Sequence, residues 1–443
     1  MIWAFLPLFL LGTNQVVGAF VHPSRAATTS ANPSVTSTSI FAHENDDEQQ
    51  SNARLSKTGR RGFLGTTGAA TLAIGGLTNN LLVPPASAVS SSPPSALSQQ
   101  PSSPRVVLWG FGNQNKLMAR YLYEKKIPVV GVVSHHDVGK DYGLLDYAPW
   151  TSINKKTGVT IVDESAAPAM LSSTNANICI MCTKSTLSDI YPALETCATN
   201  KVNVITIAEE LLFSSGSSPR QTQQLDALFR TNGVSVTGSG FIDGAVCQMA
   251  LALSSNMHRI TGMEGTLRYD ADCNGPVLAA AHGIGLTTKE FEKQIVRNKD
   301  QEKSYVYNSN EWFASALGLH VANTKEERRP ITATTSVYSK AQDRTIPMGD
   351  VIGMKVVATT TTKEKVTIRA EQIGTVYSQK TEKDFTGWKF LGEPSGVSFS
   401  MDGPPTSEMT NTATISRIGQ ILEAEAGYVT TDMLEIARYR HWS

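Results

Sequence analysis

The first residues with the types and spacing for chemistry form a glycine turn, in which Gly110 and Gly112 follow the apolar run VVLW. A Cβ at the first glycine would block the sharp turn, and one at the second would block the approach of a diphosphate. The next residues have helical spacing, so the N–H groups of Asn113 and Gln114 would face that anion at a helix N-terminus. Asn115 replaces the third glycine of the usual G-x-G-x-x-G pattern. These residues indicate a dinucleotide-binding turn.

The second apolar run, IPVVGVVS, ends where an Asp or Glu would bind the ribose 2′-hydroxyl of NAD. Here the chain has Ser134, His135 and His136 instead. Without a carboxylate to repel it, a 2′-phosphate could be held by the Ser134 hydroxyl and the His135 ring, so the sequence favours NADP(H) over NAD(H). In the alternative, Asp137 takes the acidic role and the histidines are exposed loop residues.

Two polar clusters follow later strand-like runs. Thr183, Lys184 and Ser185 come after the run ANICIM, at the edge where cofactors lie in such folds, and they are expected cofactor contacts. Glu209 and Glu210 follow the run VNVITIA, and a carboxylate there could attract a substrate ammonium. The alternative is that one of them faces solvent or begins a helix as a dipole-matched residue.

His282 lies in the glycine-flanked segment AHGIG, before a helix that Thr287 or Thr288 would cap. Histidine exchanges a proton near neutral pH, so His282 is a candidate general acid or base. A loop histidine is nevertheless more often structural. Cys179 and Cys182 have C-x-x-C spacing, but no second such pair exists in the chain, and alternation along a buried strand explains them without a metal.

Alternating elements are expected to position these residues. Strand-like runs cover 106–109, 127–134, 159–162, 176–183, 202–208 and 234–237, with helical spacing at 113–125, 187–199 and 219–232. Such alternation predicts an α/β fold with a doubly wound parallel Rossmann sheet. Residues 334–357 and 365–379 are rich in Thr, Val and Ile, as strands of a second, α+β domain would be. A last helix is expected over 416–426, capped at Gly427.

Several stretches resemble, in order over residues 105–435, the dihydrodipicolinate reductase-like amine dehydrogenases that include 2,4-diaminopentanoate dehydrogenase. They are VVLWGFGNQNKLMARYL, VGVVSHHDVGKDYG, CTKSTLSDIYPAL, VNVITIAEELLF, LDALFRTNGVSVTGSGF, AAHGIGLTTKEFEK and TISRIGQILEAEAGYVTTDML. The resemblance implies a middle domain that supplies substrate contacts and a subunit interface, hence a homo-oligomer, and a last helix that returns to the first domain. It also implies reversible hydride transfer between nicotinamide and the C–N carbon of a small amine, imine or amino acid.

The chain departs from this family at the expected substrate pocket. The Asn-Pro-Gly turn of diaminopentanoate-type enzymes reads Ile242-Asp243-Gly244, which makes Asp243 a candidate substrate contact and predicts a substrate other than diaminopentanoate. The His-His and Lys signature of 4-hydroxy-tetrahydrodipicolinate reductases has no counterpart in the second domain. Reductase activity of this kind is therefore an alternative for which the catalytic residues are missing. A second alternative is a protein that is not an enzyme, namely a sensor or assembly factor that binds NADPH without turnover.

The first part of the chain has the composition of a targeting sequence. The apolar run IWAFLPLFLL and Val17-Gly18-Ala19 predict a signal peptide over 1–19. The following Ser/Thr-rich stretch begins at Phe20 and resembles the plastid presequence of algae with complex plastids, such as diatoms. Arg60-Arg61 resembles a twin-arginine signal for the thylakoid lumen. In the alternative, the two arginines only supply the positive charge that a presequence needs for import. Secretion is the alternative if only the first signal acts.

Composition limits the partners. The 39 Lys and Arg residues balance the 39 Asp and Glu residues, so no basic surface for nucleic acid is expected. No stretch after residue 105 offers 18 uninterrupted apolar residues, so membrane integration is not expected either. The expected division is a signal peptide (1–19), a transit, twin-arginine-like and linker segment (20–104), an NAD(P)-binding Rossmann domain (105–240), an α+β substrate and interface domain (241–412) and a C-terminal helix (413–443).

Overall fold

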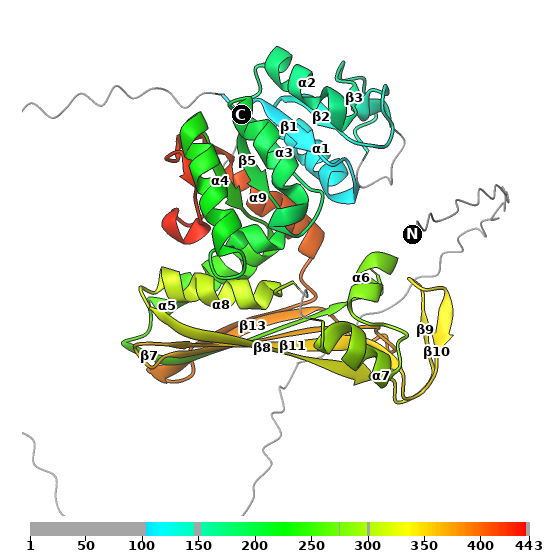
Figure 1. Cartoon of the computed structure of the whole chain (residues 1–443), viewed down its shortest axis with the longest axis vertical. Helices are drawn as coiled ribbons and strands as arrows, with labels where there is room; N and C mark the ends of the chain where they lie inside the picture. The colour runs from blue at the N-terminus through cyan, green and yellow to red at the C-terminus, as the bar shows by residue number, and fades with distance from the viewer. Residues whose placement is uncertain (1–102, 146–151, 274, 299–301, 440–443) are drawn as a thin grey trace, which may run out of the picture. The chain divides into compact units, whose positions relative to one another are not determined.

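The computed structural model describes residues 103–145, 152–273, 275–298 and 302–439 (Figure 1). The expected signal peptide, transit segment and twin-arginine motif lie outside the described residues. Within these ranges no helix combines the length and apolarity needed to cross a bilayer.

Seven parallel strands form the first sheet, in the order β15-β6-β5-β4-β1-β2-β3. Their bounds are β1 (Val106–Trp109), β2 (Val129–Val133), β3 (Ile161–Val162), β4 (Ile178–Met181), β5 (Asn203–Thr206), β6 (Ser235–Gly238) and β15 (Gly427–Tyr428). The order reverses between β1 and β4, so a crevice for ligands opens at the carboxyl ends of these two strands. This arrangement confirms the predicted doubly wound Rossmann sheet.

Helices cover both faces of the sheet because its strands are apolar on both sides. In β1, Val106 and Leu108 pack with α1 (Asn113–Glu124) and α9 (Thr406–Glu423). Val107 and Trp109 point to the opposite face, and the helices on that face are α2 (Ala167–Thr174), α3 (Leu187–Thr199) and α4 (Pro219–Asn232). All four of these strand residues are at most 2% exposed. Period-two alternation thus places β1 centrally between two helical layers.

The end of the chain differs from the expectation of a helix over 416–426. Helix α9 begins ten residues earlier, at Thr406, and ends at Glu423. The segment TSEMTNTAT is poor in strong helix formers, but Asn411 and Thr414 are fully buried against the first domain, so tertiary packing overrides propensity. Gly427 does not cap the helix, since it starts β15 with φ +129°, where a Cβ would lie 2.4 Å from Oδ1 of Asp226.

A second sheet of six strands has the order β14-β13-β7-β12-β11-β8, in which only β7 and β12 pair in parallel. Its bounds are β7 (Arg259–Asp270), β8 (Val321–Thr332), β11 (Val351–Thr362), β12 (Thr367–Thr375), β13 (Phe385–Glu393) and β14 (Ser398–Asp402). The strand-rich stretch expected at 334–357 contains the separate hairpin β9 (Val337–Ser339) and β10 (Arg344–Ile346) before β11. This mixed sheet confirms the expected second domain.

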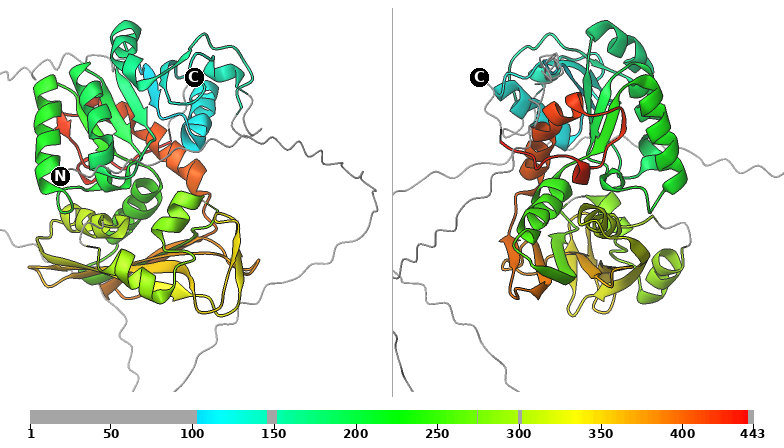
Figure 2. Two further views of the ribbon diagram at one scale, coloured as in Figure 1. Left: turned by 45° about the vertical axis from the view of Figure 1, so that its right-hand side comes forward. Right: turned by 90° about the vertical axis from the view of Figure 1, so that its left-hand side faces the viewer.

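Helix α8 (Tyr305–Ala316) lies between the two sheets (Figures 1 and 2). Its residues 305–314 are all buried. On one side, Nδ2 of Asn310 donates to the carbonyls of Ala358 and Ile368 at 3.1 Å. On the other, Nε1 of Trp312 donates to Oγ1 of Thr431 at 3.0 Å, beyond β15. The helix therefore ties the second sheet to the first domain. Shorter helices are α5 (Met249–Ser254), α6 (Pro276–Ala281) and α7 (Thr288–Phe291).

Candidate active site

The glycine turn after β1 has the shape of a diphosphate cradle. Gly110 has φ +81°, and a Cβ there would lie 2.5 Å from both the Cys182 carbonyl oxygen and Cγ2 of Thr183. Around Gly112 nothing lies within 4 Å of a Cβ position, so the backbone is open to a ligand. Helix α1 starts at Asn113 with no side-chain cap and no acidic residue in its first turn. Free amides at a helix N-terminus suit an anion, so these residues fit the diphosphate of a dinucleotide.

Asn115 explains why the third glycine is dispensable. Its side chain is fully buried, and Nδ2 donates to the carbonyls of Trp109 at 3.1 Å and Gly110 at 2.8 Å. Its Oδ1 accepts from Sγ of Cys182 at 3.2 Å. The amide thus joins the turn to the end of β4. The neighbouring Gln114 side chain bonds to α9, through Ser407 and Asn411, so only its backbone N–H is available to a cofactor.

Gly110→Ala is expected to weaken binding of a nicotinamide dinucleotide by about 10-fold or more, because the left-handed backbone and the Cys182 carbonyl both oppose a Cβ. Calorimetry on the folded variant measures this change. Gly349→Ala is the matched control, since Gly349 has φ +92° with nothing within 4 Å and lies far away in the turn before β11. Equal affinity in wild type and Gly110→Ala would contradict the assignment of the turn.

At the end of β2, one of the residues expected to choose between NAD and NADP, His135, lies beside two carboxylates of the next strand's loop. His135 lies between two carboxylates, with Nδ1 3.4 Å from Oδ2 of Asp163 and Nε2 3.4 Å from Oε1 of Glu164. Ser134 accepts the His136 amide at 3.1 Å. Asp137, the alternative acidic residue, has Oδ1 2.7 Å from Nζ of Lys140. Asp163 and Glu164 follow β3, and sequence analysis had not singled them out.

A cavity of 730 Å³ opens beside the glycine turn, between the carboxyl edge of the first sheet and the second sheet. Two of the expected cofactor contacts, Gln114 and Ser185, lie on its wall. All four expected substrate and catalytic residues line it as well, namely Glu209, Glu210, Asp243 and His282. Thr183 and Lys184 are exposed just outside, after β4.

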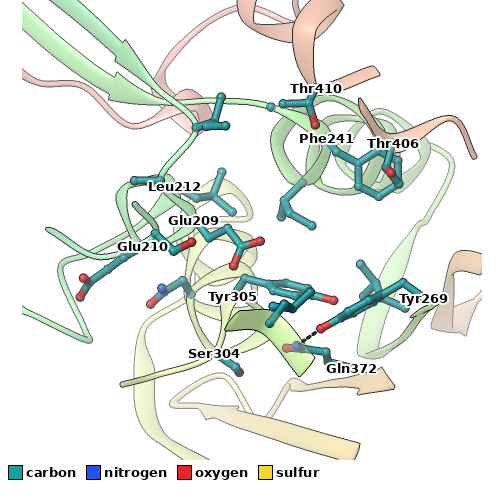
Figure 3. A pocket seen from close by; sticks show the side chains of 18 of the residues that line it. Glu209, Glu210, Leu212, Phe241, Tyr269, Ser304, Tyr305, Gln372, Thr406 and Thr410 are labelled. Atoms are coloured by element: carbon teal, nitrogen blue, oxygen red, sulfur yellow. Dashed lines mark hydrogen bonds between the residues drawn. The ribbon is translucent and has the colours of Figure 1, made fainter. Parts of the chain in front are cut away.

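Glu209 presents a carboxyl group to the interior of the cavity. It begins the short 3-10 turn Glu209–Leu212 (η3) after β5, and its side chain points toward Tyr305 (Figure 3). Glu209 is exposed to the solvent of the cavity, but the protein atoms around its carboxyl group partly desolvate it and raise the pKa of Glu209 to about 7. A carboxyl group with this pKa exchanges a proton at neutral pH, as a general acid or base must.

Glu210 points to the other side of η3 (Figure 3). Its Oε2 accepts the first amide of α3, from Leu187, at 2.7 Å. Its Oε1 accepts the hydroxyls of Ser217 at 2.8 Å and Ser218 at 2.5 Å. These contacts place the carboxylate at the N-terminus of the preceding helix α3, where it suits the helix dipole, rather than at the start of the next helix.

Asp243 belongs to the π-helix Ile242–Gln248 (η4) and forms a buried ion pair with Arg417 of α9. Nε and Nη2 of Arg417 donate to the two carboxylate oxygens, both at 3.0 Å, and Ser239 donates to one of them at 2.8 Å. Both charged side chains are fully buried. The carboxylate therefore faces α9 rather than a ligand. Asp243 borders the cavity as a structural residue, not as the predicted substrate contact.

His282 ends α6 and is bonded to a tyrosine that sequence analysis missed. Its Nε2 lies 2.7 Å from the Tyr269 hydroxyl, and its Nδ1 lies 2.9 Å from the Leu278 carbonyl. Gln372 donates to the same phenol oxygen at 2.6 Å (Figure 3). Burial lowers the pKa of His282, which is 3% exposed, and burial raises the pKa of Tyr269. At neutral pH the pair is thus a neutral imidazole and a neutral phenol.

Cys179 and Cys182 are both free thiols that pack in or next to β4. Cys179 is buried within β4, and Cys182 bonds to Asn115 as described above. In the ranges the structure covers, no three His, Cys, Asp or Glu side chains gather as metal ligands.

Known proteins share this architecture. A family model for the C-terminal domain of 2,4-diaminopentanoate dehydrogenase matches residues 245–440. The 2,4-diaminopentanoate dehydrogenase of Acetoanaerobium sticklandii is 25% identical over 247 residues, which are 55% of this chain and 67% of that enzyme. The structure of an amine dehydrogenase from Mycobacterium smegmatis is 30% identical with a TM-score of 0.68, and the match covers 76% of this chain and 98% of that one.

These relatives are dehydrogenases, which implies a nicotinamide cofactor, and the glycine turn fits one. The match to the amine dehydrogenase extends over both domains and therefore includes the cavity between them. The chain belongs to the 2,4-diaminopentanoate dehydrogenase-like family of amine dehydrogenases.

Proposed function

We propose that this protein transfers hydride reversibly between NADP(H) and the nitrogen-bearing carbon of a small amine, imine or amino acid. The observation that carries the proposal is the Glu209 carboxyl group, which lies in the cavity beside the diphosphate cradle with a pKa of about 7.

The chemistry needs a base at this place. An alkylammonium ion cannot release hydride from its carbon, because the nitrogen has no lone pair to form the C=N bond. Glu209 removes the ammonium proton at neutral pH and becomes a neutral carboxylic acid, whose carbonyl oxygen can still accept a hydrogen bond from the imine nitrogen. The nicotinamide ring, when bound, accepts the hydride. Apolar side chains of Leu212, Phe241 and Leu267 line the same cavity.

A substrate panel tests the proposal. Purified protein is mixed with NADP or NADPH and with small amines, diamines, amino acids and the matching ketones or keto acids plus ammonia, and cofactor absorbance is followed. We expect turnover with at least one amine and its carbonyl partner. Tight NADPH binding without turnover on any member would contradict the proposal and favour the alternative of a sensor.

Preference for NADP(H) rests on the end of β2. Asp137 pairs with Lys140 and is not free to accept from the ribose, while the Ser134 hydroxyl can still donate to a 2′-phosphate. The His135 ring would bind the phosphate by turning away from Asp163 and Glu164. We expect His135→Asp to lower the NADPH-to-NADH ratio of kcat/KM by about 10-fold or more. His136→Asp is the neighbouring control with a smaller expected change. A wild-type enzyme that prefers NADH would contradict this preference.

We also propose a plastid location, supported by the presequence-like composition of residues 1–104. A fluorescent fusion of the full chain in the native cell tests it, with fractionation to separate stroma from thylakoid lumen. Label in the medium would instead establish secretion.

We further propose that the protein forms a homo-oligomer through its second domain, which the family resemblance supports. Light scattering of the purified protein tests this proposal, and the mass of a monomer would contradict it.

A further inference from the structure

The proposed reaction has a second proton-transfer requirement that Glu209 does not meet. After the amine proton and the hydride have left, Glu209 holds a proton. Water must still add to the imine carbon, and ammonia must leave. Water addition needs a base, and release of ammonia needs an acid, so another group in the same cavity has to exchange protons.

Tyr269 and His282 have the geometry for this exchange. Tyr269 comes from β7 on the second sheet, and Glu209 from the edge of the first, so the two groups reach the cavity from different domains (Figure 3). The Leu278 carbonyl can only accept a hydrogen bond, so the neutral His282 ring carries its proton on Nδ1. Nε2 is then the acceptor of the Tyr269 hydroxyl proton, at 2.7 Å. The imidazole can take a proton only through the phenol.

The surroundings hold this pair in place. Gln372 donates to the phenol oxygen from β12, opposite the histidine. Gly374, two residues further along β12, lies against the imidazole, because a Cβ there would be 2.4 Å from Nε2 of His282 and 3.0 Å from Cζ of Tyr269. The strand thus carries an amide donor and a glycine at the two positions that fix the phenol and the ring.

We infer that Tyr269 is a second catalytic residue, which transfers protons during imine hydrolysis and its reverse, with His282 as the positioning residue that stores the proton. This inference rests on the proposed function. As water forms its bond to the imine carbon, its proton passes to the Tyr269 oxygen and the phenol proton passes to Nε2 of His282. The proton on the Tyr269 oxygen then passes to the nitrogen of the carbinolamine, and the proton on Nε2 of His282 returns to the Tyr269 oxygen. The C–N bond breaks, the carbonyl forms, and the hydroxyl proton leaves with ammonia as ammonium, so the imidazole ends neutral.

Stopped-flow oxidation of the best amine of the panel tests the inference, because hydride transfer precedes hydrolysis. In Tyr269→Phe we expect a burst of about one reduced cofactor per site, followed by turnover at least about 100-fold slower than in wild type. In Glu209→Gln we expect no burst. Tyr338→Phe makes the same chemical change at an exposed position in the β9–β10 hairpin and is expected to behave as wild type. Loss of the burst in Tyr269→Phe, with wild type active, would overturn this inference alone, whereas no turnover by wild type would reject the proposed function.

Two further measurements keep the test independent of folding defects. Gly374→Ala changes neither Tyr269 nor His282 in the sequence, but its Cβ pushes the imidazole away from the phenol. We expect an intact burst, which reports a folded site, with slowed turnover, and a wild-type rate would overturn the inference. Nitrogen-15 NMR of the free protein, with the His282 signal assigned by its absence in His282→Gln, is expected to show the Nδ1-protonated tautomer. An Nε2-protonated ring would overturn the inference without any substrate.

Discussion

Glu209→Gln is expected to lower kcat for amine oxidation by about 10²- to 10⁴-fold, the usual contribution of a general base. The amide keeps the shape of the side chain but cannot take the ammonium proton. Steady-state kinetics with the best amine of the panel measure the loss. Glu210→Gln makes the same change at the neighbouring position and serves as the control. We expect a smaller loss of kcat, because the Glu210 carboxylate is bonded to α3 and to two serines rather than facing the substrate.

The same variant should abolish a specific pH dependence. Desolvation raises the pKa of Glu209 to about 7, so wild-type kcat for oxidation should rise with pH through that value as the base form appears. A flat profile in wild type, or an unchanged inflection in Glu209→Gln, would contradict the role of this residue.

Stability provides the control for misfolding. Because the pKa is raised from its ordinary 4.5, the folded state binds the proton more tightly than the unfolded chain, and this contribution to stability is lost as pH rises toward about 7. Glu209→Gln lacks the desolvated charge. It should therefore be at least as stable as wild type above pH 7, and a large loss of stability would attribute the kinetic defect to folding.

Arg417→Met is expected to destabilise the protein by about 3–5 kcal/mol, because it leaves the fully buried Asp243 carboxylate without its partner. Denaturant unfolding measures the free energy. The double variant Asp243→Leu with Arg417→Met removes both charges and should recover part of the loss, since an apolar pair needs no desolvated counter-ion. A single-variant cost below about 1 kcal/mol would show that the pair is hydrated, in contradiction to the structure.

This pair also connects stability to the site. Asp243 lies in the π-helix η4, whose first residue, Ile242, lines the cavity together with Phe241. Arg417 also donates to the Glu435 carbonyl at 2.7 Å, so it ties η4 to the end of the chain. Loss of the pair should therefore raise KM for the amine in any variant that still folds.

The strands and helices of the first domain were predictable from sequence because their periodicity is local. Each of β1, β2, β4 and β5 is a short apolar run bounded by turn residues, and α3 and α4 were predicted with their observed bounds. Strand β15 was missed because two residues carry no periodicity, and its pairing with β6 depends on a segment almost two hundred positions away. Gly427 was misread for the same reason, since its close contact with Asp226 is a tertiary one.

Glu209 could be predicted because the position of a residue after a parallel strand already places it at the ligand edge. Asp243 follows β6 and satisfied the same argument, but its carboxylate belongs to Arg417, which lies 174 positions later. Tyr269 could not be predicted, because its partners are 13 and 103 positions away and nothing local says which face of β7 the phenol occupies. Sequence position therefore located the edge of the cavity, and tertiary contacts decided which carboxylates face it.

Transfer of deuterium from substrate to cofactor tests the central claim most directly. Amines of the panel that carry deuterium on the nitrogen-bearing carbon are incubated with the protein and NADP, and the reduced cofactor is analysed by mass spectrometry. We predict that the label appears on the nicotinamide ring with wild type and is lost with Glu209→Gln. Reduced cofactor without deuterium, or no reduced cofactor with any amine, would contradict it.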